Sequence, residues 1–137
     1  MKAIALLLLI GVTAGSAQTK SYLVKLSTPV NSKTSKAGDR IRAAMISPES
    51  LLNGYLEGEI EKAQTKPAGV LVLRFNRLLY KGKTTPLQTE VIDWVNSKGH
   101  KNVDDEERAV TLDQGELGTA GPELWLDEGS ELRVRIQ

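Results

Sequence analysis

The sequence predicts an all-β protein, a small barrel or closed sandwich of six to eight mostly antiparallel strands. Apolar and polar residues alternate with a period of two through most of residues 22–136, as in half-buried strands. Turn signals that contain glycine separate the alternating segments. The chain has no cysteine, so burial rather than disulfide bonding must hold it together. Closing the sheet also removes exposed strand edges, which favours a barrel or a sandwich.

Six segments carry the alternation, and we expect each of them to form a strand. In order along the chain they are residues 22–26, 39–46, 54–63, 69–80, 86–95 and 131–136. The segment 69–80 is long and apolar, with several large side chains on one face. We expect seven apolar residues to line the core: Ile60, Leu71, Leu73, Phe75, Val91, Leu132 and Val134.

Short turn signals stand between these segments. Lys81-Gly82 separates two strand patterns and predicts a hairpin, because glycine readily adopts the positive φ that such a turn needs. Asn53-Gly54, residues 67–69 and Glu128-Gly129 are further turn signals. Residues 47–52 are expected to form one helical turn, with Ser47 as its N-cap and proline at its first helical position.

Residues 96–122 are predicted to form the largest loop system. Three glycines and Pro122 interrupt any regular element in its second half. Asp104 and Glu107 have the spacing of a capping box, which leaves a short helix open as an alternative. The glycines lack the G-x-G pair of a dinucleotide-binding fingerprint, so no cofactor is predicted from them.

The N-terminal residues 1–17 have the pattern of a cleaved signal peptide. Lys2 precedes an apolar run at residues 3–12, and small residues at Gly15 and Ala17 suit signal peptidase. A ten-residue helix reaches about 15 Å, half of the roughly 30 Å of a bilayer core. We therefore expect export to the periplasm or the medium, with no lipid anchor and no transmembrane segment after cleavage. Residues 18–137 would form a single β domain.

Charge and residue types exclude several functions. The chain has 18 Lys and Arg against 17 Asp and Glu, and the signal peptide carries one of the lysines and no acid. The mature chain is thus formally neutral, which argues against a nucleic-acid partner. His100 is the only histidine, so neither a usual zinc site nor a serine triad is expected. The acidic run 104–107 lacks the alternation and glycine of a recognisable calcium loop. No catalytic residue, metal or cofactor is predicted.

Charged residues at strand positions are weak candidates for a partner-binding face. Glu57, Glu59 and Glu61 point outward on one predicted strand and would repel one another without nearby cations. Alternating arginines on two other strands could neutralise them: Arg40, Arg42, Arg133 and Arg135. We expect a balanced, ion-paired surface, with an arginine face for an acidic partner as the alternative.

Two tryptophans, Trp94 and Trp125, are the other candidates. An exposed tryptophan could stack on a sugar ring of an envelope glycan. The chain has only six aromatic residues, so we expect both tryptophans to be buried in the core.

The order of motifs resembles a known family. Residues 37–43 (AGDRIRA), 56–60 (LEGEI) and 70–78 (VLVLRFNRL) are followed by Lys81-Gly82 and, at the end, by 126–134 (LDEGSELRV). This order resembles the C-terminal β-barrel domain of TrbI-like channel subunits of type IV secretion and conjugation machines, over about residues 22–95 and 124–136. The resemblance implies a barrel fold, an envelope location and a role in assembly. Those subunits also carry a membrane helix, a proline-rich linker and a helical insertion that this sequence does not contain, so a channel is not implied.

These observations lead to three ordered hypotheses of function. The first is an exported, non-enzymatic β-domain protein of the bacterial cell envelope that binds an envelope protein or associates with itself. The second is a ligand-binding module for an envelope glycan. The third is a hydrolase that uses two carboxylates, for which the many acids of the chain provide no specific pair.

Overall fold

We describe residues 20–97 and 110–137 of a computed structural model. Three of the predictions above fall on residues outside these ranges. They are the signal peptide at residues 1–17, the histidine at position 100, and the acidic run at 104–107 with its capping-box spacing.

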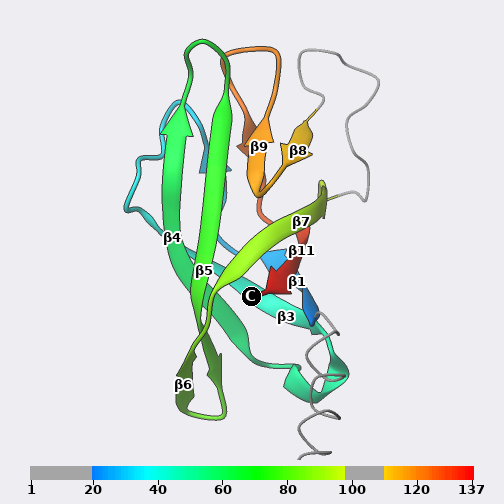
Figure 1. The fold of residues 1–137 in the computed structure, drawn as a ribbon. Helices are drawn as coiled ribbons and strands as arrows, with labels where there is room; N and C mark the ends of the chain where they lie inside the picture. The colour runs from blue at the N-terminus through cyan, green and yellow to red at the C-terminus, as the bar shows by residue number, and fades with distance from the viewer. Residues whose placement is uncertain (1–19, 98–109) are drawn as a thin grey trace, which may run out of the picture.

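Eleven strands and one short 3-10 turn make up the regular structure of the described residues (Figure 1). The strands are β1 (Ser21–Leu26), β2 (Val30–Asn31), β3 (Arg40–Ser47), β4 (Tyr55–Gln64), β5 (Val70–Tyr80), β6 (Lys83–Pro86), β7 (Thr89–Val95), β8 (Thr111–Asp113), β9 (Glu116–Gly118), β10 (Trp125–Leu126) and β11 (Glu131–Ile136). The turn is η1 (Glu49–Leu51), between β3 and β4. The all-β prediction is confirmed.

Nine of these strands form one antiparallel sheet that curls into a nearly closed barrel. Its order is β7-β11-β1-β3-β4-β5-β9-β8, with β6 attached to β5. β7 comes back against β5, so the wall of the barrel meets itself between these two strands (Figure 1). We call this line the seam. β2 and β10 form a separate two-stranded sheet. Several strands have only two or three residues, too few for a visible alternation, which is why the sequence predicted fewer strands.

The core is the one that the alternation predicted. All seven predicted core residues are buried, with at most 2% of each exposed. Leu56, Leu117 and Leu126 join the same cluster, and so does Trp94. Burial of this continuous apolar surface supplies the main stabilising free energy of a domain without disulfides.

The turn at Lys81 and Gly82 is a two-residue hairpin between β5 and β6, as predicted. Lys81 has a φ of 50° and Gly82 a φ of 76°. Two consecutive positive φ values give the turn whose twist matches that of the flanking strands. The hairpin projects from one end of the barrel, at the bottom of Figure 1.

The helical turn predicted at residues 47–52 exists, but its predicted cap is wrong. η1 begins at Glu49, and Pro48 occupies the cap position without a side-chain hydrogen bond. Ser47 is the last residue of β3. The physical reason is that Pro48 is itself extended, with φ −78° and ψ 158°, so the turn begins one residue later than predicted and Ser47 remains in β3.

The segment 96–122 contains more regular structure than its composition indicates. β8 and β9 form a short hairpin within it, and β9 pairs with β5. Leu117 of β9 is fully buried in the core.

Within the described ranges, no helix has the length and apolar character needed to cross a bilayer.

Candidate functional site

The outer face of β3, β4 and β5 carries a ladder of opposite charges. Arg42 Nη2 lies 2.5 Å from Glu57 Oε2, and Arg74 Nη2 lies 2.7 Å from Glu61 Oε1. Arg77 contacts two glutamates: its Nη1 lies 3.4 Å from Glu59 Oε2, and its Nε lies 3.7 Å from Glu57 Oε1. Each glutamate has an arginine from a neighbouring strand, so the predicted cross-strand ion pairing is confirmed. The charged face, as we call it, consists of Arg42, Glu57, Glu59, Glu61, Arg74 and Arg77.

Only one of the four arginines predicted to neutralise these glutamates does so. Arg42 pairs with Glu57, whereas Arg40 stands opposite Glu59 in register without an ion pair to any described residue. The predicted contribution of the other two arginines is wrong. They lie on β11, between β1 and β7, and β11 does not adjoin β4. Alternation reports the face of a residue, but not which strands become neighbours.

The arginines of β11 have other partners. Arg135 pairs with Glu90 of β7, whose side chain is only 12% exposed. Arg133 Nη1 donates a hydrogen bond to Ser21 Oγ at 3.3 Å. These contacts join β11 to both of its neighbours and give Arg135 a role in covering a largely buried carboxylate.

The cations that the sequence analysis missed are Arg74 and Arg77 of β5. Strict alternation assigns these two residues to opposite faces of β5, so the sequence does not indicate that both contact the glutamates of β4. A bulge changes this: Glu57 stands opposite Arg77, while the next residue, Gly58, stands opposite Phe75. A Cβ added at Gly58 would lie 1.9 Å from the carbonyl oxygen of Arg74, so the close approach of the strands requires glycine here.

The seam between β5 and β7 is closed by a side chain rather than by a strand ladder. Thr89 is fully buried, and its Oγ1 accepts a hydrogen bond from Phe75 N at 3.1 Å and donates one to Phe75 O at 2.8 Å. Arg74 Nη1 donates to Thr89 O at 3.1 Å. The backbone N–H and C=O of Phe75, which form no strand ladder with β7, are therefore hydrogen-bonded by the Thr89 side chain instead. Nothing in the composition around Thr89 signals this role.

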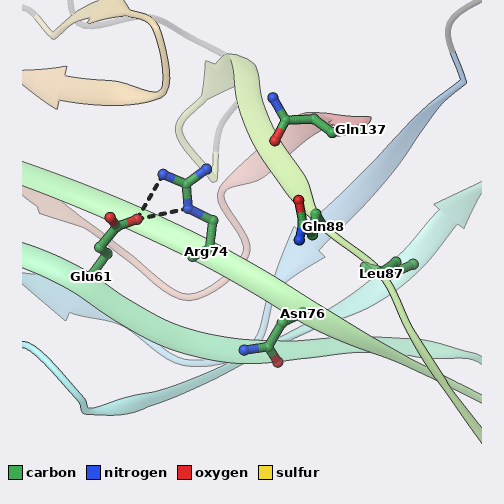
Figure 2. A pocket seen from close by; sticks show the side chains of 6 residues that line it. All are labelled: Glu61, Arg74, Asn76, Leu87, Gln88 and Gln137. Atoms are coloured by element: carbon green, nitrogen blue, oxygen red, sulfur yellow. Dashed lines mark hydrogen bonds and ion pairs between the residues drawn. The ribbon is translucent and has the colours of Figure 1, made fainter.

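A shallow groove opens on the outside of this seam. Its volume is about 330 Å³. Figure 2 shows Arg74 directed toward Glu61, with Gln88 and Gln137 on the other side of the groove. Glu61 and Arg74, the two charged residues that line it, form an ion pair of 2.7 Å, and Asn76 Nδ2 donates a hydrogen bond to Glu59 Oε1 at 2.7 Å. The seam groove, as we call it, is lined by Glu61, Arg74, Asn76, Leu87, Gln88 and Gln137.

The end of the barrel at the β5–β6 hairpin is different in character. A hollow of about 250 Å³ lies between this hairpin and the start of β4. Tyr55 is 37% exposed there. The Arg42 guanidinium lies 4.6 Å from the centre of the Tyr55 ring, and Lys81 Nζ lies 5.4 Å from that of Tyr80. The tyrosine end, as we call it, is lined by Asn53, Tyr55, Leu79, Tyr80, Lys81, Gly82, Lys83 and Thr84.

The two tryptophans do not form a stacking platform together. Trp94 is 4% exposed and belongs to the core, as expected. Trp125 is partly buried, stands opposite Asn31 in the small second sheet and lies outside the core cluster, so the prediction that the core includes it is wrong.

The ionisable groups give little indication of acid–base or metal chemistry. The Ser97 hydroxyl donates a hydrogen bond to the Asp127 carboxylate and, with a second from Ser130, holds the pKa of Asp127 below its ordinary value, against a weaker effect of burial. A general acid needs a raised pKa instead. Over residues 20–97 and 110–137, no three acidic, histidine or cysteine side chains gather as metal ligands would.

Comparison of the chain with protein-family models, with curated proteins and with solved structures found no match. The resemblance to TrbI-like subunits stays a prediction. Function is therefore inferred from the three surfaces above.

Proposed function

We propose that this chain is an exported, non-enzymatic protein of the bacterial cell envelope that binds another macromolecule through its tyrosine end. One observation carries the proposal. The tyrosine end combines the exposed ring of Tyr55 and the half-buried Leu79 and Tyr80 with Lys81 and Lys83, and no described residue lining it is a carboxylate. Aromatic residues are enriched in protein interfaces, where a polar, solvent-accessible rim surrounds an apolar centre.

The charged face is the less favourable place for a partner. Its arginines already pair with Glu57, Glu59 and Glu61. A partner would have to break these ion pairs and form new ones with its own charges. Exposed ion pairs contribute little to the free energy of binding. We therefore assign the charged face a role in keeping β3, β4 and β5 in register.

The export part of the proposal rests on residues 1–17 and on the envelope location that the resemblance implies. Intact mass of the protein recovered from envelope and medium tests it. The expected species begins at Gln18. A cell-associated protein that still carries Met1 would contradict export with cleavage.

Capture from envelope extract tests the binding site. The purified protein is coupled to resin and compared with the Tyr55→Ser/Lys83→Ala variant and with Arg40→Ala. Arg40 is a suitable control because it is exposed and lies outside the tyrosine end without an ion pair to a described residue. We expect the wild type and Arg40→Ala to retain the same protein, and the tyrosine-end variant to lose it. Equal retention by all three would place the contact elsewhere.

Self-association is measured on the same variants by sedimentation velocity. A dimer of the wild type that the Tyr55→Ser/Lys83→Ala variant loses would make a second copy of the chain the partner. A dimer that all variants form equally would show that the tyrosine end does not mediate association.

A second candidate is an envelope glycan bound in the seam groove. The observation that favours it is a pair of amides, those of Gln88 and Gln137, whose side chains form no hydrogen bond with a described residue beside the apolar Leu87. Amides and an apolar surface are suited to sugar hydroxyls and sugar ring faces. Calorimetric titration with soluble cell-wall fragments should give saturable heat that Gln88→Ala/Gln137→Ala abolishes. No heat with the wild type removes this candidate.

A further inference from the structure

The tyrosine end presents an uninterrupted row of uncharged side chains across three adjacent strands. Tyr55 of β4 stands opposite Leu79 of β5, and Leu79 stands opposite Thr84 of β6. The next row toward the barrel is charged, with Glu57 opposite Arg77. The hollow thus has an apolar wall on one side and borders the charged face on the other.

Two lysines complete the hollow on the side of the hairpin. Lys81 and Lys83 are exposed, and neither forms an ion pair with a described residue. Arg42, on the opposite side, is already engaged by Glu57 and by the ring of Tyr55. The cations available to a ligand are therefore the lysines at the tip of the β5–β6 hairpin, which projects from the barrel (Figure 1).

The hairpin is poorly suited to extending its sheet with a strand from a partner. β6 has four residues and ends at Pro86, which has no backbone N–H to donate. Lysine and proline on a short edge strand are features that protect against strand addition. Recognition at this end must then use side chains.

A concave site also fits a polypeptide better than a membrane surface. A hollow of about 250 Å³ can receive a side chain, whereas a bilayer contacts protruding residues. Two lysines provide only a weak attraction to anionic lipid. Charge complementarity with an acidic segment, by contrast, needs only local cations at the rim of an apolar hollow.

We infer that the tyrosine end binds an acidic polypeptide segment of a partner protein, an inference that rests on the proposed function. An apolar side chain of that segment packs against Tyr55 and Leu79. A carboxylate of the same segment contacts Lys81 and Lys83. The segment is thus recognised by an apolar residue close to Asp or Glu.

Selection from a library of random peptides displayed on phage tests this inference on the full chain. The wild type should enrich peptides that contain Asp or Glu near Leu, Phe or another large apolar residue. A synthetic copy of a selected peptide should bind the Lys81→Glu/Lys83→Glu variant at least about tenfold more weakly, since two favourable contacts become repulsive. The loss should shrink at high salt, because the lysines are exposed.

The matched control is Lys33→Glu/Lys36→Glu. It makes the same change in net charge at two exposed lysines between β2 and β3, away from the hollow. We expect it to bind the peptide like the wild type. Circular dichroism of both variants verifies that the fold is intact.

Each other outcome identifies what fails. Selected peptides without acidic residues, whose binding is still lost in Tyr55→Ser, overturn the acidic segment and leave the proposed function standing. Peptides that bind Tyr55→Ser and Lys81→Glu/Lys83→Glu equally well overturn both. Failure to enrich any peptide, or binding only to vesicles of phosphatidylglycerol and phosphatidylcholine, overturns the acidic segment as the ligand.

Discussion

The charged face and the tyrosine end are neighbours on β4 and β5, yet their charges are arranged in opposite ways. On the charged face Glu57, Glu59 and Glu61 all lie within 4.0 Å of an arginine on an adjacent strand. At the tyrosine end Lys81 and Lys83 have no described carboxylate as a partner. The charged face, which carries more charges, is thus the region in which the charges are paired. Our proposal of the tyrosine end as the binding surface rests on this difference, since its lysines lack a described carboxylate partner and lie beside an exposed aromatic ring.

Both regions depend on β5, and the seam holds β5 against β7. The largest expected effect therefore comes from Thr89→Val, which removes the hydroxyl that joins Phe75 N and Phe75 O. Two buried backbone groups lose their partner, at a cost of about 2–4 kcal/mol in the free energy of unfolding. Urea denaturation measures this cost. Thr89→Ser keeps the hydroxyl and should lose less than half as much, whereas equal stability of Thr89→Val and wild type would contradict the role of the seam.

A charge reversal within the ladder tests the structural role of the charged face. Glu57→Lys places a third cation between Arg42 and Arg77 and should lower the free energy of unfolding by about 1–2 kcal/mol. The difference should largely disappear in about 1 M salt, where exposed charges are screened. Arg40→Ala is the control and should change stability by less than about 0.5 kcal/mol. A Glu57→Lys variant as stable as Arg40→Ala would show that the ladder does not stabilise the sheet.

The opposite result is expected at the tyrosine end. Lys81→Glu/Lys83→Glu should change the free energy of unfolding by no more than about 0.5 kcal/mol, because no ion pair with a described residue is lost. The same urea experiment measures it. A loss above about 1 kcal/mol would mean that these lysines are structural, and the contrast between the two regions would no longer hold.

The smallest effect concerns a carboxyl that belongs to neither region. The pKa of Asp127 is lowered in the folded state, chiefly by the hydrogen bond from Ser97. Its stabilising contribution is complete above the unfolded pKa of about 4 and is lost as pH falls through the lower folded value. In Asp127→Asn this part of the acid dependence should be absent, as measured by urea midpoints between about pH 6 and pH 3. Glu128→Gln, the adjacent control, should keep the dependence of the wild type.

Much of the fold could be predicted because alternation reports burial directly. Leu71, Leu73 and Phe75 share a buried face, and Glu57 and Glu59 point outward, as a period of two requires. The hairpin at Lys81-Gly82 was predictable because its backbone conformation demands such residues. These features depend on residues close together in the sequence.

The features that could not be predicted depend on pairing between distant strands. The bulge opposite Gly58 brings Arg74 and Arg77 to one face, and no local pattern records it. No sequence feature distinguishes Thr89 from other polar residues, because its role arises only where β7 packs against β5. The tyrosine end was missed because residues 53–55 and 79–84 meet only through the register of β4 and β5.

Heteronuclear NMR of the labelled protein, titrated with a peptide selected as above, locates the binding site by residue. We expect shifted amide signals to concentrate at residues 53–55 and 79–84, while those of the charged face and of Gln88 in the seam groove stay in place. The Lys33→Glu/Lys36→Glu variant should give the same map, and Lys81→Glu/Lys83→Glu should give much smaller shifts at the same peptide concentration. Shifts concentrated on the charged face or at the seam groove would contradict the assignment of the tyrosine end as the binding site.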